Sequence, residues 1–79
     1  MNELVMKIVE EQRLDAFMKL NPEWLGDCEV YHFVKNYFDS YNGLPPYALV
    51  KKKFDYDSDA PFEYWWDEYE NAGIVKEFS

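Results

Sequence analysis

Three aspartates at alternate positions, in the stretch DYDSDAPFEYWW, match the start of a calcium-binding loop. Asp55, Asp57 and Asp59 occupy its first, third and fifth ligand positions. The sixth position needs glycine for a sharp turn and is Ala60, and the twelfth needs a bidentate glutamate and is Trp66. Because both departures remove a required feature, we expect no metal site. We interpret the stretch as a solvated loop in which Asp59 caps the next helix.

Three consecutive lysines, Lys51 to Lys53, could hold a phosphate. The three glycines lie far apart and none precedes a Lys-Ser or Lys-Thr pair, so no phosphate loop accompanies the lysines. The lysines end a predicted helix, where the helix dipole favours cations. We therefore expect a solvated helix C-terminus, for which an acidic protein surface is a better ligand than a nucleotide.

His32 and Cys28 are the single histidine and the single cysteine, one helical turn apart. A Cys-His hydrolase needs an oriented pair and an oxyanion site, and no pattern in the sequence indicates either. One cysteine also excludes an internal disulfide and a cysteine-rich zinc site. We therefore expect a surface histidine, a half-buried cysteine, no catalytic residue and no cofactor.

The negative charge of the chain limits the classes of partner that it can bind. The net charge is −8 over 79 residues, and residues 55–79 carry −7 of it. Nucleic-acid binding is disfavoured because phosphates require a basic surface. We expect no signal peptide, because acids interrupt the first apolar run, and no membrane span, because every apolar run is short. The single cysteine fits a reducing compartment, so we expect a cytoplasmic protein.

The elements that position these residues are helices. Apolar residues at intervals of three and four predict helices over residues 3–20 (one helix with a register change, or two short ones), 27–41, 47–54 and 62–72, with a brief turn after Asn21. Asn2, Asn21 and Asp27 are the predicted caps. We expect the end of the last helix at Gly73 and a short tail at 74–78. The fold class is all-α, a small bundle of about four to five short helices in one domain, 1–79.

The connection YNGLPPY can be interpreted either as a corner between two helices or as a ligand for a proline-binding groove. Asn42-Gly43 predicts a left-handed helix stop and Pro45 a corner between helices. The letters LPPY also match short ligands of proline-binding grooves. Because helical patterns flank the stretch on both sides, we favour the corner.

Aromatic residues make up 20% of the chain, more than a core of this size needs. The predicted last helix carries an aromatic stripe on one side. Tyr64 lies on the opposite side, beside acidic residues of the same helix. Such a stripe is a core face by default, but a fold of 79 residues can leave it half covered. We therefore predict a partner interface there, made of Phe62, Tyr64, Trp65, Trp66 and Tyr69, with a core face as the alternative.

The stretch from Leu20 to Phe54 resembles the N-terminal helical domain of DnaB-like replicative helicases, particularly phage versions. The resemblance rests on helix-core and corner positions, with Pro46 where the family has Ser or Thr. The matching residues are Leu20, Pro22, Glu23, Trp24, Tyr31, Phe33, Val34, Tyr41, Gly43, Pro45, Leu49 and Phe54.

The resemblance implies a non-catalytic assembly domain in a bacterial host cell. Its partners would be further subunits, a primase or a helicase loader, without direct contact to nucleic acid. The chain would be either one domain of a longer ATP-dependent helicase or a stand-alone relative. The alternative function is that of a stand-alone acidic phage or mobile-element protein that modulates a replication or host protein, including as a DNA mimic.

Overall fold

Helices account for all regular structure in the described part of the chain, which is residues 1–56 and 59–72 of a computed structural model. They are α1 (Asn2–Glu10), α2 (Leu14–Met18), the 3₁₀ turn η1 (Pro22–Trp24), α3 (Glu29–Tyr41), α4 (Tyr47–Lys53) and α5 (Phe62–Asn71). The predicted small all-α bundle is confirmed. No helix of the described residues is long and apolar enough to cross a membrane. The predicted stop at Gly73 and tail at 74–78 lie outside the described residues.

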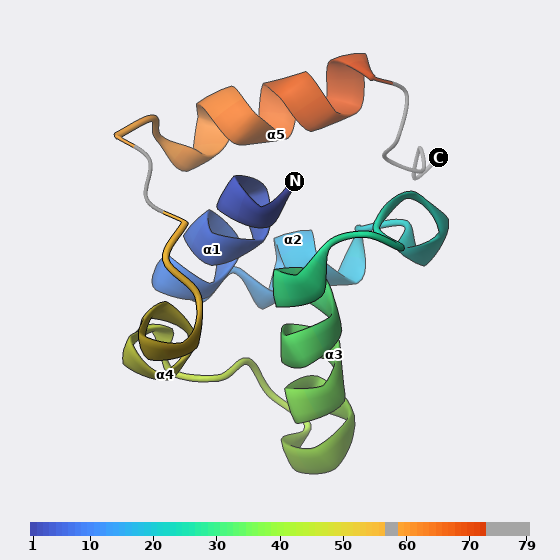
Figure 1. Ribbon diagram of the computed structural model, residues 1–79. Coiled ribbons are helices and arrows are strands. Elements are labelled where there is room, and N and C mark those ends of the chain that lie inside the picture. The colour runs from blue at the N-terminus through green and yellow to red at the C-terminus, as the bar shows by residue number, and fades with distance from the viewer. Residues whose placement is uncertain (57–58, 73–79) are drawn as a thin grey trace.

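α1 is the centre of the bundle, because α2, α3, α4 and α5 all pack against it. Figure 1 shows it between α5 on one side and α3 and α4 on the other. A helix covered on several sides must be apolar around much of its circumference. The sequence of α1 meets this requirement with five buried residues: Leu4, Val5, Met6, Ile8 and Val9.

The first predicted segment forms two helices, which was one of the two alternatives. The break lies at Gln12, whose φ of 52° is left-handed and cannot continue a right-handed helix. Its side-chain amide donates hydrogen bonds to the carbonyls of Val9 at 2.8 Å and Pro45 at 3.0 Å. After the break the apolar stripe is incompletely buried, since Leu14 is 40% and Met18 is 61% exposed.

Two predicted helix boundaries are confirmed. Asn42 ends α3 in the left-handed conformation, with φ 59° and ψ 34°. The side chain of Asn21 begins η1 by accepting a hydrogen bond from the backbone N–H of Glu23 at 3.1 Å. Pro45 is buried between α3 and α4, so the Pro-Pro stretch forms the predicted corner.

Three other predicted caps are wrong. Asn2 lies inside α1, and its Oδ1 instead accepts from the backbone N–H of Val30, in the first turn of α3, at 3.3 Å. The N-cap residue of α3 is Cys28 and not Asp27. Asp59 makes no cap, because Pro61 directly precedes α5. The backbone N–H of Val30 has no acceptor within α3, and Asn2 of α1 supplies one. A local sequence pattern cannot indicate an acceptor that comes from another helix.

Candidate protein-binding surfaces

The structure divides the predicted α5 interface between core and surface. Phe62 and Tyr69 are buried, 5% and 0% exposed. Trp65 and Trp66 are partly buried and pack against the core, whereas Tyr64 is 50% exposed. Most of the stripe is therefore the face by which α5 packs onto α1, with one edge open to a partner.

Tyr69 connects α5 to the residue before η1. Its hydroxyl oxygen accepts a hydrogen bond from the backbone N–H of Asn21 at 3.0 Å. Burial raises the pKa of Tyr69, which keeps the phenol neutral at ordinary pH. Phe62 is held between the ring of Trp66, at 5.5 Å between centroids, and the guanidinium of Arg13, 4.5 Å from the ring centre. These two predicted interface residues have structural roles.

The outer surface of α5 is acidic and carries one aromatic pair. The rings of Tyr64 and Trp65 meet edge to face at 5.0 Å. The exposed acidic residues of the helix are Glu63, Asp67, Glu68 and Glu70. A partner that binds this surface must therefore tolerate or require negative charge.

A groove lies between α2, η1 and α3, hereafter the α2–α3 groove, and the sequence did not predict it. Its volume is about 390 Å³. The ring of Phe17 stacks on that of Tyr31 at 5.5 Å and lies 6.0 Å from that of Phe38, which gives the groove an aromatic wall. Its apolar lining is Phe17, Met18, Leu20, Pro22, Tyr31 and Phe38.

Helical spacing explains how α3 contributes to this groove. Tyr31 and Phe38 are seven residues apart, so they lie two turns apart on the same side of α3. Phe38 belongs to the apolar stripe predicted for residues 27–41, and Tyr31 lies beside that stripe without being part of it. An apolar residue outside the main stripe, here the buried Tyr31, was the signal that could have indicated the groove.

The charged residues that line the groove are both lysines, Lys19 and Lys35. The ammonium of Lys35 donates to a carboxylate oxygen of Asp39 at 2.6 Å and lies 6.0 Å from the ring centre of Phe38. The hydrogen bond to Asp39 raises the pKa of Lys35. Burial raises the pKa of Tyr31, so the groove has a neutral phenol and two cations at physiological pH.

Cys28 and His32 do not form a reactive pair. The thiol of Cys28 donates to Oδ1 of Asn2 at 3.0 Å, and burial raises its pKa, which disfavours the nucleophilic thiolate. The ring Nε2 of His32 is 2.8 Å from the carbonyl oxygen of Gly26. Cys28 is more fully buried than expected, at 5% exposed.

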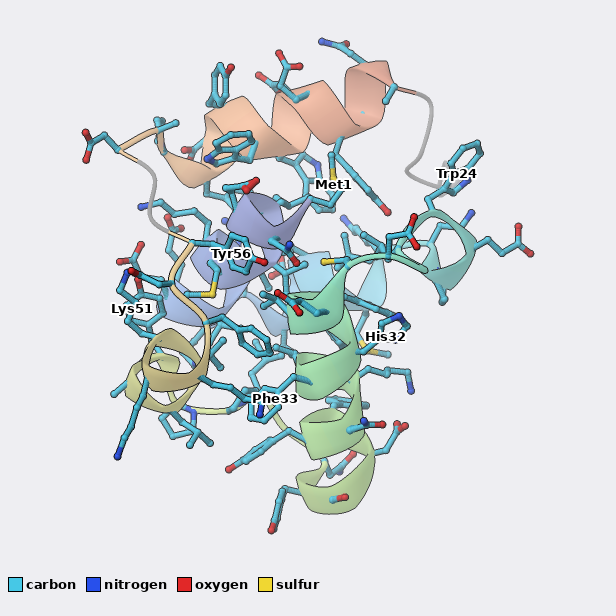
Figure 2. All side chains as sticks on the ribbon, in the orientation of Figure 1. Met1, Trp24, His32, Phe33, Lys51 and Tyr56 are labelled. Atoms are coloured by element: carbon cyan, nitrogen blue, oxygen red, sulfur yellow. The ribbon has the colours of Figure 1, made fainter. Side chains whose placement is uncertain are left out.

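Two lysines of the triplet, Lys51 and Lys53, make contacts within the chain. Lys51 donates to Asp55 at 2.8 Å, and the ammonium of Lys53 lies 5.5 Å from the ring centre of Phe33. Figure 2 shows Phe33 pointing from α3 toward α4 and His32 on a different side of α3. Asp57 of the calcium-like loop lies outside the described residues. Within the part that is described, no cluster of three or more histidine, cysteine or acidic residues could bind a metal.

Comparison with known proteins gives no relative for this chain. It matches no protein-family model, and no significant match occurs among curated proteins or solved structures.

Proposed function

We propose that this chain is a non-catalytic protein-interaction domain that binds its partner through the α2–α3 groove. The observation that carries this proposal is the groove itself, an open hollow of about 390 Å³ with a largely apolar lining. Met18, at its edge, is 61% exposed. Exposed apolar surface of this kind is typical of protein-binding sites.

The surroundings of the candidate reactive residues support a role without catalysis. Cys28 is held protonated by burial, and its hydrogen-bond partner is an asparagine rather than a base. His32 contacts a backbone carbonyl. Neither group is arranged to transfer a proton or attack a substrate.

We further propose that the partner belongs to a replicative helicase assembly of phage type, in the bacterial cytoplasm. The resemblance to the DnaB-like N-terminal domain motivates this assignment. The resemblance depends on a long α3, an Asn-Gly stop, a proline corner and a short α4 whose C-cap residue is Phe54. The partners would be a second helicase subunit, a primase or a loader.

Measuring the mass of the protein in solution with purified helicase ATPase domain, primase and loader tests the proposal. We expect a complex with one of them. Met18→Glu places a charge at the edge of the groove and should abolish the complex. Leu49→Glu, the same kind of change at an exposed apolar residue of α4, should leave it intact. A chain that binds none of these proteins, or loses nothing on Met18→Glu, contradicts the proposal.

The acidic outer face of α5 favours a second candidate function, that of a DNA mimic. Its exposed carboxylates would replace phosphates on a basic DNA-binding protein. This function predicts competition with DNA that weakens steeply with added salt. Glu63→Gln combined with Asp67→Asn should weaken the competition, and Met18→Glu should not. The two candidate functions thus depend on different surfaces.

A further inference from the structure

The corner between α3 and α4 begins with an Asn-Gly pair, in which the side-chain amide is open to attack by the backbone. Asn42 is the one asparagine of the chain that is followed by glycine. Because glycine has no Cβ, no side chain shields the backbone nitrogen that follows Asn42. Asparagine is a thermolabile residue, since its amide can lose ammonia. Asn42 is therefore the asparagine of this chain that is most open to that loss.

The reaction proceeds through a cyclic imide and needs only water. The backbone nitrogen of Gly43 attacks Cγ of Asn42 and gives its proton to water or hydroxide. The bond from Cγ to the side-chain nitrogen breaks, and this nitrogen takes up a proton and leaves as ammonia. Water then opens the ring. Cleavage between the Gly43 nitrogen and Cγ yields aspartate, whereas cleavage between that nitrogen and the main-chain carbonyl carbon yields isoaspartate.

The fold holds neither of the two reacting groups. Asn42 is exposed, and within the described residues its side-chain amide has no hydrogen-bond partner. The N–H of Gly43 and the backbone carbonyl of Asn42 also lack a protein partner there. Water can therefore reach the amide, and the peptide group between the two residues can rotate without losing a hydrogen bond.

The corner has room for the rotation that the attack requires. The peptide group must turn away from the ψ of 34° that Asn42 has at the end of α3. The space beside Gly43 is open, since a Cβ atom at this position would have no atom of a more distant residue within 4 Å. The cap hydrogen bond, from the N–H of Asn42 to the carbonyl of Phe38 at 2.7 Å, precedes the rotating bond and is kept. The reaction thus needs a local change of the corner and no unfolding of α3.

We propose that Asn42 and Gly43 form a site of spontaneous deamidation in the folded protein, and that the products weaken the junction of α3 and α4. Each product adds one negative charge to a chain that carries −8. The new carboxylate lies at the C-terminus of α3, where the helix dipole disfavours negative charge. Isoaspartate also adds a methylene to the backbone before the buried Pro45, whose carbonyl accepts from the side-chain amide of Gln12 at 3.0 Å.

Peptide mapping by mass spectrometry tests the site after incubation of the folded protein in mildly alkaline buffer. We expect Asn42 to convert to a mixture of aspartate and isoaspartate, and to convert faster at higher pH because the attack requires loss of the Gly43 proton. Asn36 is the internal control, since it is also exposed but lies within α3, and it should keep its amide. A synthetic peptide of residues 41–47 gives the rate without the fold. An intact Asn42 in the folded protein, over a period in which the peptide converts, would refute the proposal.

Gly43→Ala is the matched variant, because a Cβ hinders the attack and the fold has space for it. The φ of Gly43 lies outside the left-handed region, so alanine introduces no backbone strain. Before incubation, the variant should have a urea midpoint no lower than that of the wild type. Its Asn42 should convert severalfold more slowly. Equal rates for the variant and the wild type would show that the Gly43 nitrogen is not the attacking group.

The effect on the corner is measured on the products, which ion exchange separates from the unmodified protein by their added charge. In the isoaspartate form, the NMR signals of the Gln12 side-chain amide and of the backbone amides of Leu44 and Tyr47 should shift. Its urea midpoint should be lower than that of the unmodified protein. Asn42→Asp reproduces the aspartate product without the longer backbone and should lose less stability. An isoaspartate form with an unchanged midpoint and unchanged Gln12 signals would refute the weakened junction.

Discussion

Asn2 shows how one side chain can serve a helix other than its own. Its Oδ1 accepts from the backbone N–H of Val30 at 3.3 Å and from the thiol of Cys28 at 3.0 Å. The first N–H groups of a helix have no partner within that helix. Asn2 thus joins α1 to the start of α3 and satisfies one of these groups.

Replacement of Asn2 by alanine should destabilise the protein by about 1 kcal/mol, the usual cost of losing a cap. The midpoint of urea unfolding measures the change. Asn36→Ala is the matched control, because Asn36 is exposed in the middle of α3 and should change stability by less than about 0.5 kcal/mol. Equal midpoints for Asn2→Ala and the wild type would contradict the assigned cap.

Removal of the Tyr69 hydroxyl should also destabilise the fold. Tyr69→Phe keeps the ring but leaves the N–H of Asn21, a buried residue, without its acceptor, at a cost of about 1–3 kcal/mol. Tyr64→Phe removes the same group from a half-exposed ring on the same helix and should change little. Urea unfolding of the two variants compares them directly, and equal stabilities would argue against the hydrogen bond.

The connection between α1 and α2 depends on the backbone and side chain of Gln12. Alanine at this position loses the hydrogen bonds to Val9 and Pro45 and keeps the left-handed strain, whereas glycine loses the same bonds without that strain. Both variants should be less stable than the wild type. Gln12→Ala should be the less stable of the two by about 0.5–1 kcal/mol in thermal unfolding. The reverse order would show that the left-handed conformation is not retained.

A helix could be predicted from the sequence where its apolar spacing and its end residues lie within or next to the helix itself. The buried Val30 and Val34 of α3, the Asn42 stop and the Asn21 cap all follow from neighbouring residues. The caps assigned to Asp27 and Asp59 fail, because a short polar residue near a helix start favours a cap but does not establish one.

The candidate sites could be predicted less well, since they depend on how helices meet. The periodicity of α5 identifies one apolar face, but it does not say whether Tyr69 contacts a partner or Asn21 in the same chain. The α2–α3 groove takes its walls from α2, η1 and α3, three separate elements that the chain brings together. Such an arrangement is a property of tertiary packing and has no periodic signature.

At the scale of the whole molecule, α1 should make unfolding cooperative. Ile8 is fully buried in the helix that every other α-helix contacts. Ile8→Val removes one methylene and should cost about 0.5–1.5 kcal/mol. Tryptophan fluorescence, which reports mainly on the environments of Trp65 and Trp66, and far-ultraviolet circular dichroism should shift together by the same amount. An earlier fluorescence transition would mean that α5 separates as its own unit.

Stability should decrease at alkaline pH. Burial raises the pKa of Cys28, Tyr31 and Tyr69 above their ordinary values, about 8.5 for a thiol and about 10 for a phenol. Across that range the folded state therefore holds more protons than the unfolded state, so the free energy of unfolding falls as pH rises. The urea midpoint should be lower at pH ~10.5 than at pH ~7.5. Tyr69→Phe should reduce the difference, and a pH-independent midpoint would contradict the assignment.

The central position of α1 also has a consequence for synthesis on the ribosome. α1 is made before all four helices that cover it, and α5 is the last of the described helices to be made. At about 5–20 residues per second, several seconds pass between them. During that interval the apolar side chains of α1 are only partly covered, so the nascent chain is a target for chaperones until α5 emerges.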